Sequence, residues 1–238
     1  MLGKPDLKQY LSSGQFLGLL AKRMYFSLGD LQAVLSARYP DLKRPTLSRY
    51  MVDLMKARVV YGAGRGWYSV IDQPFEVDRE HVKKIVDLLV KKYPLLAFSC
   101  WSTEQVKTYV HHMLSRFVTF IYVDWDAMSA VGPFLESQGY VVWVNPRGKD
   151  IERFHVAREK TVVIRPTISI KSTDDHYAPI EKILVDLLVE VRKLPLMDES
   201  EYEIVRKNIL ESGRVDIGTL IFHSRRRNVQ MDRMVFRA

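Results

Sequence analysis

The sequence predicts a mixed α/β fold: an N-terminal winged helix-turn-helix followed by an α/β domain with a central sheet and a helical C-terminal part. Within about the first 70 residues, three helical patterns precede a strand, a glycine turn and a second strand. Beyond residue 80, amphipathic patterns alternate with short apolar, β-branched runs. The two textures meet near Pro74, which interrupts an extended stretch, so we expect domains at residues 1–75 and 76–238.

The first domain contains three helix candidates in a row. Residues 15–25 form a short apolar segment, and residues 26–42 place apolar side chains at helical spacing before Pro40 ends the pattern. The third candidate covers residues 43–59 and has Pro45 in its first turn. Its apolar face is formed by Leu47, Tyr50, Met51 and Leu54.

The third helix has the features of a DNA-reading helix. With its apolar face turned inward, Thr46, Ser48, Arg49 and Asp53 face outward, and Lys43 and Arg44 precede the helix. In helix-turn-helix proteins the first residues of the second helix enter the major groove, where arginine reads guanine with two hydrogen bonds. We therefore predict a DNA-binding face made of Lys43, Arg44, Thr46, Ser48 and Arg49. The alternative is a basic face that contacts only solvent.

The glycine-rich segment GAGRGWY, residues 62–68, has two interpretations. A dinucleotide-binding loop needs a helix directly after its glycines, because the phosphates bind the exposed N–H groups of that helix. Here the next residues, WYSVI, alternate as in a strand. The segment is therefore predicted to be the turn of a β-hairpin, a wing that carries Arg65 toward DNA.

The second domain is expected to combine a sheet with covering helices. Strands are predicted at residues 95–101, 116–125, 140–146 and 161–170. Helices are predicted at residues 81–93, 102–114, 126–139, 178–193, 200–213 and 216–235.

Charge is concentrated at the two ends of the chain. The net charge is +8; residues 1–72 hold five Lys, six Arg, five Asp and no Glu, which gives +6. Residues 213–238 hold six Arg and two Asp, which gives +4. This placement favours an anionic partner, with double-stranded DNA as the first candidate. Arg225, Arg226 and Arg227 are a second basic patch on this reasoning, or a basic helix end without a partner.

Other composition features set further expectations. One cysteine, Cys100, excludes an internal disulfide, and it lies in an apolar run typical of a buried side chain. No signal-peptide pattern and no membrane-spanning apolar run is evident, so the expected location is cytoplasmic. We expect no cofactor and no metal.

Enzymatic readings are less well supported than DNA binding. Asp124 and Asp126 could hold a cation as part of a metal-dependent nuclease with a DNA-binding arm. Glu159 directly precedes Lys160, which departs by one residue from the Glu-x-Lys arrangement of such enzymes. His111 and His112 are adjacent and would point in different directions on a helix, and His155 and His223 stand apart from other candidate ligands. We predict a protein that is not an enzyme; a winged helix used only for protein contact is a third possibility.

The order of these blocks resembles the AbiE-type antitoxins, the regulator halves of bacterial type IV toxin–antitoxin systems. The resemblance rests on GRGWY at the wing, Trp101-Ser102-Thr103 opening a helix, the segment FVTFIYVDWDAMSAVGPFLESQGYVVWV, and PTISI followed by APIEKILVDLLVE. Glu181, Asp186 and Leu187 lie in the most family-like part, and a late arginine-containing helix completes the order. No motif of the chain matches a known antitoxic residue.

This resemblance implies a specific regulatory role. The N-terminal domain would bind inverted repeats upstream of its own operon as a repressor, with a homodimer expected on such paired sites. The C-terminal domain would counteract a nucleotidyltransferase-like toxin encoded alongside it, with or without direct contact.

Overall fold

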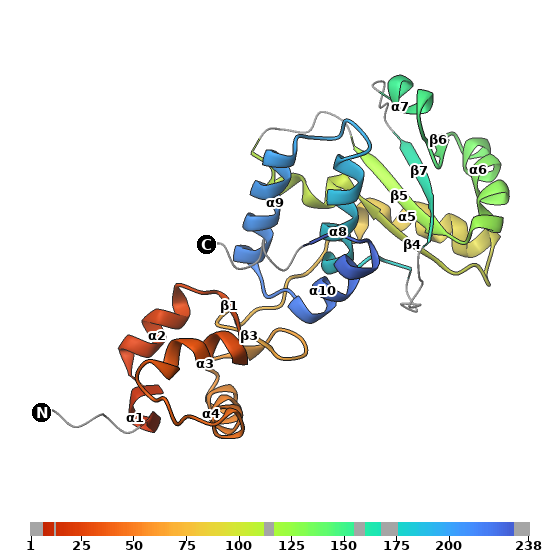
Figure 1. Ribbon diagram of the computed structural model, residues 1–238. Helices are drawn as coiled ribbons and strands as arrows, with labels where there is room; N and C mark the ends of the chain where they lie inside the picture. The colour runs from red at the N-terminus through yellow and green to blue at the C-terminus, as the bar shows by residue number, and fades with distance from the viewer. Residues whose placement is uncertain (1–6, 12, 112–116, 155–159, 168–175, 231–238) are drawn as a thin grey trace, which may run out of the picture. The chain divides into compact units, whose positions relative to one another are not determined.

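The computed structural model describes residues 7–11, 13–111, 117–154, 160–167 and 176–230, and it shows the expected mixed α/β fold (Figure 1). The chain forms two compact units. The first contains residues up to Phe75 together with Leu210–Arg225, and the second contains Glu76–Ile209 together with Arg226–Val229. The expected second domain, residues 76–238, therefore differs from the second unit, because Leu210–Arg225 packs with the N-terminal part of the chain.

The first unit has helices around a small antiparallel sheet whose strand order is β1-β3-β2. Its elements are α1 (Leu7–Leu11), α2 (Gly14–Ala21), β1 (Tyr25–Ser27), α3 (Leu28–Ser36), α4 (Arg44–Lys56), β2 (Tyr61–Gly62), β3 (Trp67–Ser69) and most of α10 (Ile217–Arg226).

Strand β1 is a correction to the sequence prediction, which placed Tyr25 and Phe26 in helical segments. Ser27 has extended backbone angles and starts α3 as its N-cap, in a capping box with Asp30. The Ser27 side chain accepts from the Asp30 backbone N–H at 3.1 Å, and the Asp30 carboxylate accepts from the Ser27 backbone N–H at 2.9 Å. Because α3 cannot extend backward past this cap, Tyr25 and Phe26 remain extended and pair with β3.

The core of the first unit confirms the predicted apolar face of the third helix. Leu47, Met51 and Leu54 of α4 are buried with Leu31 and Leu35 of α3. Helix α4 begins with Arg44 and has proline in its first turn, where the missing N–H breaks no helical hydrogen bond.

The second unit is built around a four-stranded sheet with strand order β4-β5-β7-β6. Strand β4 (Phe98–Ser102) is antiparallel to β5 (Val118–Val123), whereas β5, β7 (Thr161–Pro166) and β6 (Val141–Val144) are parallel. The helices are α5 (Glu80–Lys92), α6 (Met128–Ser137), α7 (Lys149–Arg153), α8 (Ile180–Val191) and α9 (Glu199–Ser212), whose last residues belong to the first unit.

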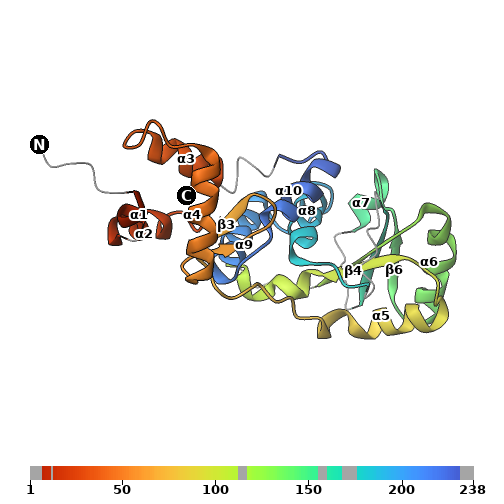
Figure 2. The ribbon, with the colours of Figure 1, turned by 90° about the horizontal axis from the view of Figure 1, so that it is seen from below.

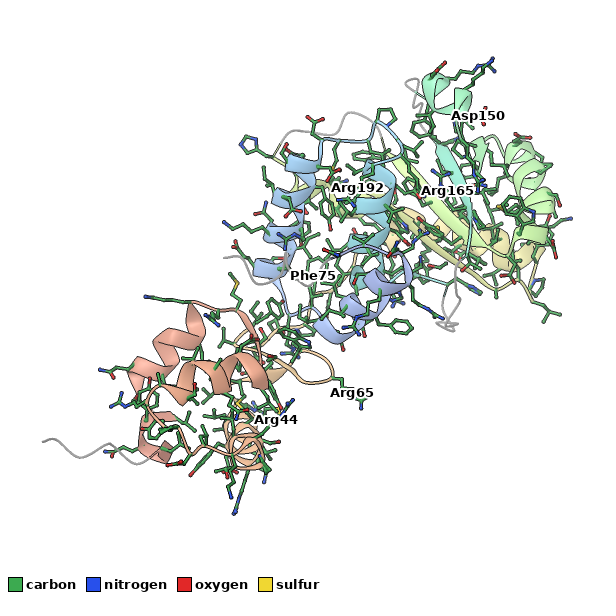
Figure 3. All side chains as sticks on the ribbon, in the orientation of Figure 1. Arg44, Arg65, Phe75, Asp150, Arg165 and Arg192 are labelled. Atoms are coloured by element: carbon green, nitrogen blue, oxygen red, sulfur yellow. The ribbon has the colours of Figure 1, made fainter. Side chains whose placement is uncertain are left out.

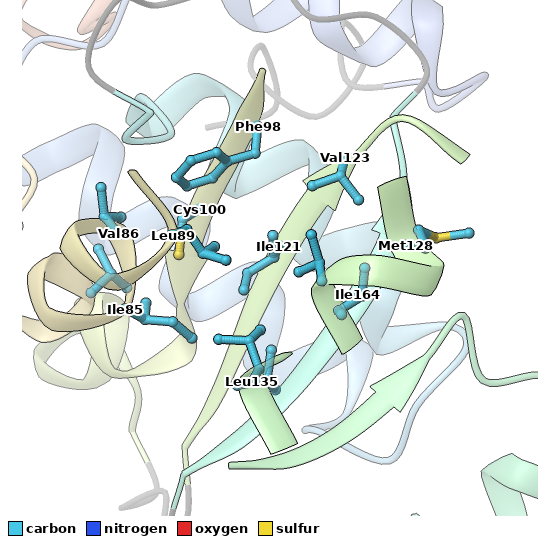
Figure 4. Packing of buried hydrophobic residues seen from close by; sticks show 13 residues of the cluster. Ile85, Val86, Leu89, Phe98, Cys100, Ile121, Val123, Met128, Leu135 and Ile164 are labelled. Atoms are coloured by element: carbon cyan, nitrogen blue, oxygen red, sulfur yellow. The ribbon is translucent and has the colours of Figure 1, made fainter. Parts of the chain in front are cut away.

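Helices α5 and α6 bury their apolar faces against one side of this sheet. Ile85 and Leu89 of α5 point toward Cys100 and Ile121 of the sheet in Figure 4, and all four side chains are buried. Cys100 is thus a small core residue, as its apolar run predicted, and burial raises the pKa of its thiol.

Helix α8 covers the opposite side of the sheet, and α5 and α8 lie on different sides of it in Figures 1 and 2. The sheet residues on the α8 side include Ser99, Tyr122 and Arg165, which are neighbours across β4, β5 and β7. Helix α9 packs on α8, where the Tyr202 hydroxyl donates to the Leu184 carbonyl at 3.1 Å.

Several boundaries differ from the sequence prediction. The helix expected at 102–114 is a short 3₁₀ helix, Thr103–Tyr109, and part of that range lies outside the described residues. The helix expected at 126–139 begins with a 3₁₀ turn, Trp125–Ala127, and α7 was not predicted. The helix expected at 216–235 corresponds to α10, which ends at Arg226, because Asn228 adopts a left-handed conformation (φ 55°) that stops it; residues 231–235 lie outside the described residues.

Candidate nucleic-acid interface

Helix α4 presents polar and basic side chains on the face opposite its core contacts. Lys43, Arg44, Thr46 and Arg49 are exposed, and Ser48 is half-buried at the edge of this face. The Lys43 side chain makes no capping bond to the helix, so the first N–H groups of α4 are not covered by a side-chain cap. The basic end of α4 can therefore offer both side chains and backbone donors to a phosphate.

Sequence reasoning missed two exposed residues on the same helix. Val52 is 42% exposed, and Lys56 is exposed in the last turn. They follow Arg49 by three and seven residues, spacings that place them on the Arg49 face of α4. The same helical periodicity that identified the buried face would have identified them.

The glycine segment forms the tight turn between β2 and β3. The Trp67 N–H donates to the Gly64 carbonyl at 3.0 Å, and the Ala63 N–H donates to the Trp67 carbonyl at 2.9 Å. Gly64 (φ 94°) and Gly66 (φ 79°) adopt backbone conformations that residues with side chains disfavour. Arg65 lies between them, is exposed, and projects from the turn in Figure 3.

The first unit is basic as a whole. Residues 1–75 contain five Lys and six Arg against five Asp, and residues 210–225 contain two Arg against one Glu and one Asp, so these two segments of the unit together carry +6. One carboxylate, Asp30, is occupied by the capping box of α3. The exposed face of α4 and the turn at Arg65 therefore belong to a unit whose net charge attracts polyanions.

The three arginines of the predicted second patch have different surroundings. Arg225 belongs to the first unit, and Arg226 and Arg227 to the second. Arg225 and Arg226 are exposed, whereas the Arg227 side chain is only 12% exposed. Arg227 pairs with Asp186, with Nη2 at 2.6 Å and Nε at 2.8 Å from Oδ1. Arg227 is thus part of a buried ion pair and not of a solvent-facing surface.

Asp186 belongs to a buried group of charges between α8 and the sheet. Its other oxygen pairs with Lys182, whose Nζ lies 3.9 Å from the centre of the Tyr122 ring. Burial lowers the pKa of Lys182 and raises the pKa of Tyr122 well above its ordinary value. The Asp186 carboxylate thus lies between two cations, Lys182 and Arg227, which fits a role in holding α8 and the segment at Arg227 to the sheet.

The same group includes a second ion pair. The Arg165 guanidinium donates to Glu190 through Nε (3.1 Å) and Nη2 (2.6 Å). Arg165 also donates to the Asn145 side chain at 3.3 Å and to the Pro146 carbonyl at 3.0 Å, and the Tyr122 hydroxyl donates to Glu190 at 3.4 Å. Arg165 is the charged residue of β7 and is next to its last residue, so this pair fixes one end of an inner strand to α8.

The residues weighed for metal-dependent catalysis are not gathered into a cluster in the part of the chain that the structure describes. Asp124 and Asp126 are exposed on either side of the 3₁₀ turn at Trp125. Within the described ranges, no group of three or more His, Cys, Asp or Glu side chains could hold a metal ion. Glu159, His112 and His155 lie outside the described residues.

The class defined by these observations is a mixed α/β protein with a basic, helix-rich first unit that exposes one face of α4 and an arginine-bearing glycine turn. A family model matches residues 46–234, most of the chain, and the chain belongs to this family, DUF6577, described as a family of unknown function. No curated protein and no solved structure matches the chain. Among the described residues, no helix is long and apolar enough to cross a membrane.

Proposed function

We propose that this protein is a sequence-specific DNA-binding transcriptional regulator whose first unit is a winged helix-turn-helix. The order α2, β1, α3, α4, β2, β3 and the sheet order β1-β3-β2 support this reading. The observation that carries the proposal is the exposed Arg49 face of α4 in the same basic unit as the Arg65 turn. On this proposal α4 enters the major groove and the turn acts as a wing.

The finer role that we propose is that of an autoregulating antitoxin. The support is the resemblance of the block order to AbiE-type antitoxins, which implies a cytoplasmic repressor acting as a homodimer on inverted repeats. A nucleotidyltransferase-like toxin would be the functional counterpart. We propose that the protein acts by binding and not by catalysis, without a cofactor.

Arg49 and Arg65 have different roles in this proposal. Arg49 lies on the outward face of α4, where an arginine can read a guanine edge with two hydrogen bonds, a contact worth about 1–3 kcal/mol of discrimination. Arg65 lies on a turn and is expected to contact phosphate or the minor groove, which contributes affinity with little sequence preference.

The experiment is a fluorescence-anisotropy titration of the upstream DNA of the gene and of a scrambled duplex, at several salt concentrations. Wild-type affinity should fall steeply as salt rises, because binding releases counterions from DNA. Arg49→Ala should lose its preference for the upstream DNA over the scrambled duplex. Arg65→Ala should lower the affinity for both duplexes by the same factor, and it should reduce by about one the slope of log affinity against log salt concentration.

Lys84→Ala is the charge-matched control, because Lys84 is an exposed residue of α5 in the second unit. It removes one positive charge and should leave both titrations close to wild type. Equal binding by wild type, Arg49→Ala and Arg65→Ala would refute the assigned face. Cleavage of the DNA in Mg²⁺ or Mn²⁺ that Asp124→Ala abolishes would favour the nuclease alternative instead.

A further inference from the structure

The C-terminal segment Leu210–Arg225 is bonded closely to the N-terminal part of the first unit. The Tyr25 hydroxyl donates to the Gly213 carbonyl at 2.9 Å and accepts from the Val215 N–H at 2.9 Å. The Arg214 N–H donates to the Gln73 carbonyl at 2.7 Å, and the Phe75 N–H donates to the Arg214 carbonyl at 2.9 Å. The segment is thereby bonded to β1 and to the residues that follow β3.

The segment then reaches the turn that carries Arg65. The Ile217 N–H, at the start of α10, donates to the Ala63 carbonyl at 2.8 Å. Asp216 starts this helix by accepting from the Thr219 N–H at 2.6 Å through its carboxylate. The first turn of α10 therefore lies directly against the backbone of the turn.

Two glycines make this close approach possible. A Cβ on Gly64 would lie 2.6 Å from the Gly218 nitrogen and even closer to the Asp216 carboxylate. A Cβ on Gly218 would lie 2.9 Å from the Arg65 nitrogen. Both contacts are with backbone or with a carboxylate used as a helix cap, so neither can be relieved by moving the end of a flexible side chain.

Gly218 differs from the glycines of the turn in one informative respect. Gly64 and Gly66 have positive φ angles, whereas Gly218 does not and lies in a helix. The helical conformation of this residue would accept alanine, and alanine is more favourable than glycine in a helix by roughly 1 kcal/mol. A glycine is therefore needed at position 218 only because the turn backbone at Arg65 lies so close.

We infer that Gly218 is a positioning residue for the wing: the first turn of α10 fixes the backbone of the turn so that Arg65 is held in its DNA-binding orientation. This inference rests on the proposed function of Arg65. It adds that the DNA-binding surface is completed by residues from the far end of the chain, although none of these residues contacts DNA.

The test is a double-mutant cycle on DNA affinity with Gly218→Ala, Arg65→Ala and the double variant. Gly218→Ala is expected to reduce affinity by the same factor as Arg65→Ala and to reduce the salt slope by about one. The double variant should bind no more weakly than Arg65→Ala alone. Once Arg65 is replaced, a change in the position of the turn removes no further contact with DNA. Gly18→Ala is the matched control, since Gly18 lies in α2 and a Cβ there meets nothing within 4 Å.

A second readout does not depend on DNA. Hydrogen exchange is measured on peptides that cover residues 61–69 and 44–56, together with thermal unfolding. Gly218→Ala should speed exchange at 61–69 and leave 44–56 unchanged. Ile217→Pro is a second variant, because proline fits the first position of a helix and deletes the N–H that bonds Ala63. It should also speed hydrogen exchange at residues 61–69.

The outcomes separate the two proposals. If Gly218→Ala binds DNA like Gly18→Ala, or if its loss multiplies with that of Arg65→Ala, the inference is overturned while the proposed function stands. If wild type binds no DNA, the proposed function fails together with the DNA-binding part of the inference, and faster exchange confined to 61–69 supports only the fixing of the turn backbone by α10. Unchanged exchange in both Gly218→Ala and Ile217→Pro would overturn the positioning role on either account.

Discussion

Removal of the Glu190 carboxylate should destabilise the second unit strongly. Glu190 is completely buried and accepts hydrogen bonds from the Arg165 guanidinium and the Tyr122 hydroxyl. The Arg165 side chain is 5% exposed, and in Glu190→Ala its guanidinium loses the only carboxylate with which it is paired among the described residues. Breaking a buried pair in this way costs about 3–5 kcal/mol, because a buried charge is left without compensation.

The exposed pair of Arg192 and Glu199 provides the comparison within the same unit. Its nitrogen and oxygen lie 3.1 Å apart, but the side chains are 44% and 57% exposed. Water replaces the lost partner at such a site, so Glu199→Ala should cost about 0.2–1 kcal/mol. The two variants therefore delete the same chemical group with an expected several-fold difference in cost.

Urea unfolding followed by circular dichroism gives the free energies. A third variant, Arg165→Met with Glu190→Leu, removes both charges and should be less destabilised than Glu190→Ala, since no unpaired charge remains. A cost below about 1 kcal/mol for Glu190→Ala, or one equal to that of Glu199→Ala, would refute the view that this pair is a buried structural link.

Three further predictions concern other parts of the chain. Tyr25→Phe removes the acceptor of the buried Val215 N–H and should cost about 1–3 kcal/mol in urea unfolding; a cost near zero would contradict the bonding of the C-terminal segment to β1. If α4 reads DNA, the exposed Val52 side chain near Arg49 could contact a thymine methyl group. Replacing that thymine of the bound site by uracil should then lower the affinity of wild type, but not that of Val52→Ala, in the anisotropy titration. Burial raises the pKa of Cys100, so the unfolded thiol ionises first as the pH rises above its ordinary value of 9.0. The stability of wild type relative to Cys100→Ala should therefore be constant below that pH and fall above it, and a difference independent of pH up to about 10.5 would exclude this linkage.

The sequence was sufficient to predict those parts of the fold that follow from local periodicity. The buried face of α4 and the glycine turn between β2 and β3 were both predicted, because helical spacing and glycine conformations are properties of short segments. Strand β1 was missed because it spans only Tyr25–Ser27 and depends on the cap of α3 and on pairing with β3. A three-residue strand has no periodicity of its own to detect.

Contacts between distant residues were beyond prediction from one sequence. Arg227 reads as one member of a basic run, yet it pairs with Asp186, 41 residues earlier in the chain. Gly218 reads as an ordinary helix residue, and only its distance from the Arg65 backbone shows why a side chain is excluded there. Even on α4, Val52 was overlooked because apolar residues are expected to be buried, although its position is on the exposed face.

The packing of Leu210–Arg225 with the first 75 residues has a consequence for synthesis on the ribosome. Ile217, whose N–H donates to the Ala63 carbonyl, follows Ala63 by 154 residues, the difference between the two positions. At about 5–20 residues per second, roughly 8–31 s pass between the synthesis of Ala63 and that of Ile217. During this interval the nascent protein has its α4 sequence but no support for the Arg65 turn. On our proposals, a product terminated before α10 would bind an operator more weakly than a chain translated through α10, because its Arg65 turn would lack support, and it would compete less well as a repressor.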